Sequence, residues 1–149
     1  MQQRYETFTV LINRISRNIR KIKNQEMAEY NLRSAHISCL YYLYSAQNLT
    51  ATDLCERCEE DKATISRALD FLEKEGYIVC ESKSIKRYKS PLLLTEKGEA
   101  VGKKISDKIG RVLDEMSVGL TEQERDSFYA SLSVISESLD RVLKKGEKL

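Results

Sequence analysis

The sequence predicts a mainly α-helical protein with one small β-hairpin. Three observations support this fold class. Glycine and proline are scarce, at 6 and 1 of 149 residues, which favours long helices. Apolar residues recur at helical spacing through most of the chain. Two short runs, at residues 77–81 and 92–94, have strand-like composition instead, and a basic segment separates them.

The composition sets limits on the class of protein. A length of 149 residues suits one domain, with or without extensions for dimerisation. A hydrophobic content of 41% supports a packed core, whereas the net charge of +2 is too small to indicate a nucleic-acid partner by itself. No apolar run is as long as a membrane span, and the start, MQQRYETF, lacks the apolar core of a signal peptide. We therefore expect a cytoplasmic protein with reduced thiols and no membrane contact.

The most informative stretch begins at Asp61, a good N-cap for a helix. Helical spacing places four apolar residues on one face: Ile65, Ala68, Leu69 and Leu72. The opposite face holds Ala63, Arg67, Asp70 and Lys74, flanked by Thr64 and Ser66. A face that is small, hydroxylic and basic near the helix N-terminus can enter the DNA major groove, where Arg reads guanine. An ordinary solvated face is the alternative.

A hairpin is predicted directly after this helix. Gly76 is placed to end the helix with a positive φ, and the strand-like runs 77–81 and 92–94 follow. The segment 82–90 between them contains no acid but four cations, Lys83, Lys86, Arg87 and Lys89. A basic hairpin tip beside a basic helix face is more specific for nucleic acid than either feature alone. The alternative for the tip is a solubilising loop.

Capping signals delimit the other helices. A first helix is expected over residues 5–30, and Ser34 is placed to cap a second that ends near residue 45. Thr50 and Asp53 form a capping box for a short helix over 51–58. Thr95 is placed to cap a fifth helix, and Thr121 with Glu124 forms a capping box for the last. Helix, short helix, turn, basic-faced helix and hairpin is the order of a winged helix-turn-helix.

The first and last helices carry more apolar surface than the central region needs. The stripes comprise Phe8, Leu11, Ile12, Ile15, Ile19 and Ile22 in the first helix, and Phe128, Leu132, Ile135, Leu139 and Val142 in the last. We expect a homodimer built from both termini; packing within one chain is the alternative. The predicted organisation is an N-terminal dimerisation helix (1–31), a winged helix-turn-helix (32–98) and C-terminal dimerisation helices (99–149).

The sequence resembles the MarR-type winged helix-turn-helix transcriptional regulators over about residues 32–98. The specific segments are LTATDLCERCEEDKATISRALDFLEKEGYI (49–78) and YKSPLLLTEKG (88–98). The Asp-Lys-small-Thr-x-Ser/Thr-Arg motif lies at 61–67, Leu-Glu-Lys-x-Gly at 72–76 and Leu-Thr-x-x-Gly at 94–98. The resemblance implies a homodimer whose recognition helices each enter a major groove. It also implies a cleft for aromatic or phenolic anions between the dimer helices and the DNA-binding lobe.

Three departures from the family pattern affect the expected DNA-binding surface. Glu59 and Glu60 precede Asp61 where the family often has Gly or Asn and an apolar residue, which should weaken DNA affinity or alter the register. Cys80 replaces an Arg that often supports the first wing strand. The wing lacks the Asp that usually orients its Arg, so the charge of Arg87 is retained while its orientation is undetermined.

Other chemistry has weak support. One histidine, His36, cannot assemble a His-rich metal site. Cys55 and Cys58 form a CxxC pair, which indicates either redox or metal chemistry or small buried residues on a core-facing helix side; Cys39 and Cys80 stand apart from it. The sequence shows no phosphate-binding glycine loop, nucleophile elbow or acid–base pair. We expect no enzyme activity, metal or cofactor.

The prediction is a DNA-binding regulator, a homodimeric repressor released by a small aromatic or anionic ligand. A thiol-switched redox sensor, or an interaction protein that does not bind DNA, is the alternative. The expected partner is double-stranded DNA, contacted by Ser34, Lys62, Thr64, Ser66, Arg67, Lys83, Lys86, Arg87 and Lys89. The expected ligand-binding residues are Met27, Tyr30, His36, Tyr41 and Tyr44.

Overall fold

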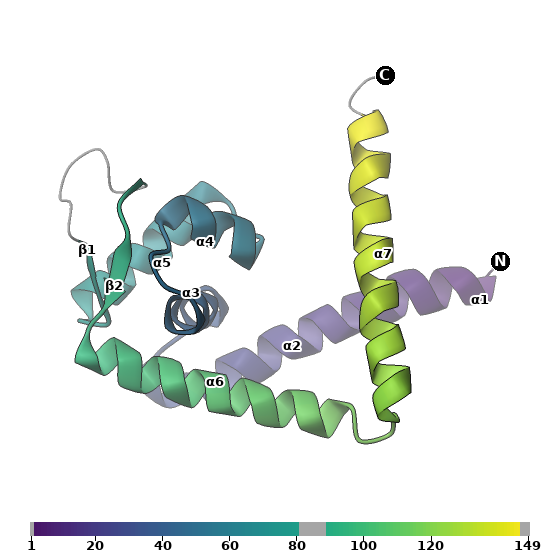
Figure 1. Ribbon diagram of the computed structural model, residues 1–149, viewed down its shortest axis with the longest axis horizontal. Helices are drawn as coiled ribbons and strands as arrows, with labels where there is room; N and C mark the ends of the chain where they lie inside the picture. The colour runs from purple at the N-terminus through teal and green to yellow at the C-terminus, as the bar shows by residue number, and fades with distance from the viewer. Residues whose placement is uncertain (1, 81–88, 147–149) are drawn as a thin grey trace. The chain divides into compact units, whose positions relative to one another are not determined.

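The computed structural model describes residues 2–80 and 89–146 (Figure 1). The chain divides into two compact units, one ending at Ile109 and the other beginning at Gly110, and each is described here by itself. Most of the described residues are helical, and one antiparallel hairpin completes the first unit. The predicted fold class, a mainly α protein with a small β-hairpin wing, is confirmed.

The N-terminal helical segment differs from the prediction at both ends. It runs through α1 (Gln2–Tyr5), a π-helical turn η1 (Glu6–Leu11) and α2 (Ile12–Glu26), followed by a separate 3₁₀ turn η2 (Ala28–Tyr30). The α-helix stops before residue 30 because Met27 has a non-helical φ of −117° and buries its side chain in the core. Asn31, in the left-handed region with φ 56°, then redirects the chain toward buried Leu32.

Helix α3 (Ser34–Ser45) ends where predicted and lies at the centre of the first unit, in contact with α2, α4, α5 and β2 (Figure 1). Its N-cap is Arg33, so the prediction that Ser34 caps this helix was wrong. The Arg33 N–H donates to Nδ1 of His36 at 3.0 Å, while the Ser34 N–H donates to Oδ1 of Asn24 at 2.9 Å. A side chain of α2 thus satisfies a free donor of α3 and joins the two helices.

Helices α4 (Ala51–Cys58) and α5 (Lys62–Lys74) begin at their predicted caps. The Thr50–Asp53 capping box is formed: the Thr50 N–H donates to Asp53 Oδ2 at 2.8 Å, and the Asp53 N–H donates to Thr50 Oγ1 at 3.2 Å. Glu59, in the left-handed region with φ 53°, ends α4. The four cysteines form no disulfide: Cys39 and Cys80 are buried, and Cys55 and Cys58 are half-buried.

The hairpin consists of β1 (Ile78–Cys80) and β2 (Leu92–Leu94), paired with Ile78 opposite Leu94 and Cys80 opposite Leu92. Gly76, with φ 78°, makes the predicted turn from α5 into β1. On the outer side of β2, the Leu92 N–H donates to the carbonyl of Leu49 at 2.9 Å. The hairpin is therefore joined by its backbone to the segment that precedes α4.

Helix α6 (Glu96–Met116) starts at Thr95, which caps it as predicted. The Thr95 hydroxyl accepts from the Gly98 N–H at 3.1 Å and donates to the carbonyl of Gly76 at 2.6 Å. Val101 and Ile105 are buried in the core of the first unit. The start of α6 is thus fixed to the turn between α5 and β1.

The second unit contains the end of α6 and helix α7 (Glu122–Gly146). The predicted capping box is present, since the Thr121 N–H donates to Oε2 of Glu124 at 2.8 Å and the Glu124 N–H donates to Thr121 Oγ1 at 3.2 Å. None of the described helices combines the length and apolar character needed to cross a membrane.

Long apolar faces remain exposed at both ends of the chain. The exposed apolar side chains of the N-terminal segment are Phe8, Val10, Leu11, Ile12, Ile15, Ile19 and Ile22. Those of α7 are Phe128, Tyr129, Leu132, Val134, Leu139, Val142 and Leu143. Contiguous apolar faces of this kind usually mark a protein–protein contact.

Candidate nucleic-acid interface

The orientation of α5 is fixed by the face that it buries. Its four core-facing residues, Ile65, Ala68, Leu69 and Leu72, are each no more than 2% exposed. They recur at three and four residues, as predicted, so the opposite side of the helix must face outward. Ala63, Arg67, Asp70 and Lys74 lie on that side and are exposed.

The first turns of α5 join an acid, a hydroxyl and a guanidinium. Asp61 Oδ1 accepts from the Thr64 N–H at 2.7 Å, and Nη2 of Arg67 donates to Thr64 Oγ1 at 3.4 Å. The hydrogen bonds from the Thr64 backbone and side chain, with the charge of Arg67, hold the pKa of Asp61 below its usual range. Arg67 is thereby directed toward the N-terminal end of the helix.

The other predicted contacts on α5 lie around this group. Lys62, the first residue of the helix, is exposed, Ser66 is half-buried, and Ala63 between them is small. A helix N-terminus also attracts anions, because its free N–H groups and the helix dipole favour negative charge. The structure therefore brings Lys62, Thr64, Ser66 and Arg67 together at one end of α5.

The remaining predicted DNA contacts come from other elements. Lys89 is exposed just before β2. Ser34 is half-buried in the first turn of α3, which packs against α5 through a stack of His36 on Phe71 with ring centroids 4.3 Å apart. Lys83, Lys86 and Arg87 lie outside the residues that the structure describes.

The five predicted ligand residues are distributed among different environments. Met27 is buried in the core, and Tyr30 accepts from Nζ of Lys104 at 2.8 Å. His36 stacks on Phe71, while Tyr41 makes an edge contact with the ring of Tyr42 at 5.3 Å. Tyr44 is the member of this set that lines the pocket described below.

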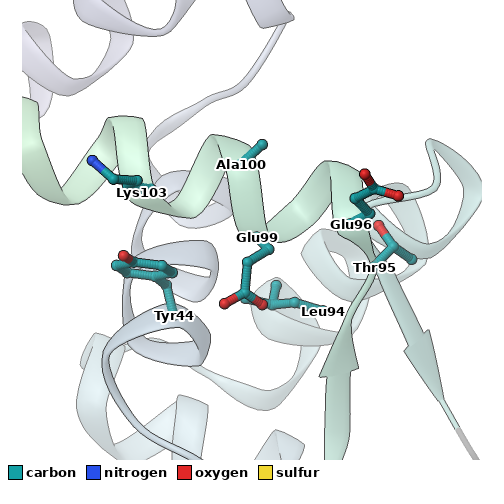
Figure 2. Close-up of a pocket in the computed structure, with 7 residues that line it drawn as sticks. All are labelled: Tyr44, Leu94, Thr95, Glu96, Glu99, Ala100 and Lys103. Atoms are coloured by element: carbon teal, nitrogen blue, oxygen red, sulfur yellow. The ribbon is translucent and has the colours of Figure 1, made fainter.

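A pocket of about 480 Å³ lies between the end of α3, β2 and the first turns of α6. Figure 2 shows its lining residues, Tyr44, Leu94, Thr95, Glu96, Glu99, Ala100 and Lys103. Among these residues, only Tyr44 was predicted from the sequence to bind a ligand. The spacing of Glu96, Glu99 and Lys103 indicates a shared helix face, but only the structure places that face opposite Tyr44.

The environment of His36, in the first turn of α3, disfavours its protonated form. Burial of the ring, and secondarily the charge of Arg33, lower the pKa of His36 below its ordinary value of 6.5. The neutral ring uses Nδ1 to accept from the Arg33 backbone. Protonation would abolish this acceptor, so the cap of α3 and the stack on α5 both favour the neutral form.

Comparison with known proteins identifies the family. A model described as "MarR family" matches residues 30–84. An uncharacterised HTH-type transcriptional regulator of Bacillus subtilis, YybA, is 26% identical over 92% of this chain and 93% of its own length.

Solved structures with this fold agree. A MarR-family transcriptional regulator from Silicibacter pomeroyi is 30% identical, with a TM-score of 0.72 over 84% of each chain. The MepR–DNA complex of Staphylococcus aureus is 20% identical, with a TM-score of 0.78 over 90% of this chain and 97% of MepR. The helix-turn-helix, the hairpin and these similarities agree: the chain belongs to the MarR family of winged helix-turn-helix transcriptional regulators.

Proposed function

We propose that this regulator is a homodimeric repressor that binds double-stranded DNA through α5 and the wing and is released by a small aromatic or anionic ligand. The observation that carries the DNA-binding part is the N-terminal end of α5. There an exposed Arg67 is held by Thr64 on a helix whose opposite face is fully buried. A rigid helix with an oriented guanidinium is suited to base readout in a major groove.

The roles of the individual residues follow from their chemistry. Arg67 reads a base edge, with Thr64 and Ser66 beside it. Lys62 and Lys89 are exposed cations and contact phosphate. Ser34 contacts phosphate through its hydroxyl, because its backbone N–H already donates to Asn24. Lys83, Lys86 and Arg87 contribute to the same partner through phosphate or the minor groove.

The test is selection of duplexes by the purified protein from a random pool, followed by titration of the selected site at fixed salt. Arg67→Ala should weaken binding by roughly 1–3 kcal/mol and relax the preference at one base position. Lys74→Ala is the matched control, since it removes one positive charge from the outer face at the other end of α5. If both variants bind and discriminate as the wild type does, the assignment of Arg67 to base readout is wrong.

The proposed homodimer is supported by the exposed apolar faces of the N-terminal segment and α7. Ile15 is 46% exposed and Val142 64% exposed in the single chain. Burying such faces against a second copy is favourable by roughly 25 cal/mol for each Å² removed from water. Sedimentation should show a dimer at micromolar concentration, and Ile15→Glu should shift it toward monomer. A folded wild-type monomer under the same conditions would contradict the proposal.

Release by a ligand is supported by the half-buried aromatic side chains of α3 and by the pocket beside Tyr44. This pocket has two carboxylates and one ammonium in its lining, so it suits the aromatic ring of a ligand better than an anionic group. A ligand releases DNA only to the extent that it binds one dimer conformation better than the other.

The ligand test measures operator affinity without ligand, with an aromatic carboxylate and with a neutral aromatic of similar size, so that it also shows which of the two the site prefers. His36→Ala and Tyr41→Phe examine the α3 side chains, and Tyr44→Ala examines the pocket. A ligand that acts through these residues loses its effect in at least one variant. An affinity that no member of a broad ligand panel changes would contradict this part of the proposal.

A further inference from the structure

Three lysines lie on one face of α6 and connect this helix to other elements of the first unit. Lys97, Lys104 and Lys108 follow one another at seven and four residues, which places them within about 40° around the helix. The ammonium group of each lysine donates to an acceptor outside α6. The acceptors belong to α5, η2 and α2 in turn, so one helix face contacts three elements.

Lys97 binds the C-terminal end of α5. Its Nζ donates to the carbonyl of Glu75, the C-cap of that helix, at 2.7 Å and lies 4.2 Å from the centre of the Tyr77 ring. The last carbonyls of a helix have no partner within the helix and form the negative end of its dipole, so a lysine suits this position. Together with the hydrogen bond from Thr95 to Gly76, this contact joins the start of α6 to the end of α5.

The other two lysines bind the end of α2 and the turn that follows it. Nζ of Lys108 donates to the carbonyl of Glu26, the last residue of α2, at 2.6 Å and lies 3.4 Å from Oε2 of the same residue. Nζ of Lys104 donates to the hydroxyl of Tyr30 in η2 at 2.8 Å. Lys108 therefore contacts the end of α2 as Lys97 contacts the end of α5, with an ammonium at the negative end of a helix dipole.

These contacts make α6 a connection between α5 and α2. From Lys97 to Lys108 the helix spans roughly 16 Å, at about 1.5 Å per residue. Helix α5 carries the face that is proposed to bind DNA, and α2 carries the exposed apolar face that is proposed to form the dimer. Contacts at both ends of this span therefore determine where the DNA-binding helix lies relative to the dimer contact.

We propose that Lys104 and Lys108 are positioning residues, which set the distance between the two recognition helices of the dimer and thereby the operator spacing that the protein accepts. This inference rests on the proposed DNA-binding homodimer, in which the separation of the recognition helices selects the spacing of two half-sites. Helix α2 is also bonded to α3, through Asn24 to Ser34 and Lys23 to Ser38. Loss of the two α6 lysines should thus loosen the angle between α2 and α6 while α2 stays attached.

The test compares duplexes that carry the selected half-sites at different separations. Each added or removed base pair changes the separation by about 3.4 Å. Wild-type protein should bind one separation best. In the variant that combines Lys104→Met with Lys108→Met, the preference for that separation over its neighbours should fall by roughly 3–10-fold, the scale of charged contacts at a surface. Its affinity for a single half-site should stay unchanged.

Three further variants make the comparison specific. Lys108→Arg keeps a positively charged donor and should retain the preference. Arg111→Met should also retain it, because it removes a positive charge further along α6 whose side chain makes no hydrogen bond or ion pair within the described part of the chain. Tyr30→Phe removes only the hydroxyl that accepts from Lys104, so it should lower the preference in the same direction by a smaller factor.

Several outcomes would overturn the proposal. The double variant could discriminate among separations as the wild type does, or Arg111→Met could lose as much discrimination. Half-site affinity could fall in step with the preference, which would indicate a merely structural role. If the double variant does not fold, unchanged discrimination in Tyr30→Phe overturns the proposal instead. Wild-type protein that binds no duplex contradicts the proposed function, and this inference with it, whereas the other outcomes contradict the inference alone.

Discussion

Replacing Gly98 with alanine is expected to destabilise the fold, whereas the same replacement at Gly110, in the same helix, is expected to stabilise it slightly. A Cβ added at Gly98 would overlap the carbonyl oxygen of Tyr77 and lie 3.0 Å from its carbonyl carbon. It would also lie 3.1 Å from Cδ2 of Leu94. A Cβ added at Gly110 meets nothing within 4 Å. The two variants share one chemical change and differ in the space available.

The magnitude follows from three effects. Alanine stabilises a helix interior by up to about 0.8–1.0 kcal/mol relative to glycine, and each variant gains part of this stabilisation. At Gly98 the overlap is with backbone, so relieving it costs roughly 1–3 kcal/mol. The same carbonyl of Tyr77 accepts from the Thr95 N–H at 3.0 Å. Displacing it weakens a hydrogen bond worth roughly 0.5–1.5 kcal/mol. Gly98→Ala should therefore lose about 1–3 kcal/mol, and Gly110→Ala should gain up to about 1 kcal/mol.

Urea denaturation at one protein concentration measures both free energies of unfolding, since the stability of a dimer would depend on concentration. A loss of about 2 kcal/mol corresponds to a fall in Tm of roughly 4–8 °C for a chain of this size. If Gly98→Ala is as stable as Gly110→Ala, the close approach of α6 to the turn before β1 is not present in solution.

Two further predictions concern His36 and Glu59. The pKa of His36, readable from its imidazole proton resonance because the chain has one histidine, should lie below 6.5. Because folding lowers this pKa, the contribution of the neutral ring to stability is complete above the pKa of the unfolded chain and is lost as pH falls through the pKa of the folded chain. His36→Gln should therefore reduce the loss of stability below about pH 6.5. A measured pKa at or above 6.5 would contradict the effect of burial. Glu59→Asn should stabilise the protein by up to about 1 kcal/mol, because Asn tolerates the left-handed conformation better. It should also tighten duplex binding by removing a negative charge near α5, and equal affinity at low salt would contradict that electrostatic effect.

Features decided within a few residues could be predicted from the sequence. The start of α4 followed from the Thr50–Asp53 box, and the start of α5 from Asp61, because a capping side chain acts on N–H groups two or three residues away. The burial of Ile65 and Leu69 followed from their helical spacing. Even so, Ser34 was assigned as a cap because its hydroxyl suits that role locally. The structure places Asn24 of α2 against its N–H instead, and only the packing of α2 on α3 determines that contact.

Contacts between distant segments could not be predicted in this way. The contact of α3 with α4 is one example, because no periodicity specifies which faces of those helices touch. The pocket is a similar case, because Tyr44 was identified from its chemistry, but the opposing Glu99 and Lys103 come from a helix beyond the hairpin. The outward face of α5, the proposed DNA contact, was predictable because it is the complement of a buried face within a single helix.

The hydrogen bond from Leu92 to Leu49 has a consequence for engineering this protein. Both ends of the wing are anchored, one by the pairing of Ile78 with Leu94 and the other by this bond to the segment before α4. The sequence between Cys80 and Leu92 can therefore be exchanged as a cassette while both anchors are kept. Wings from other regulators could thus be grafted here to change the proposed groove contacts while α5 stays in place.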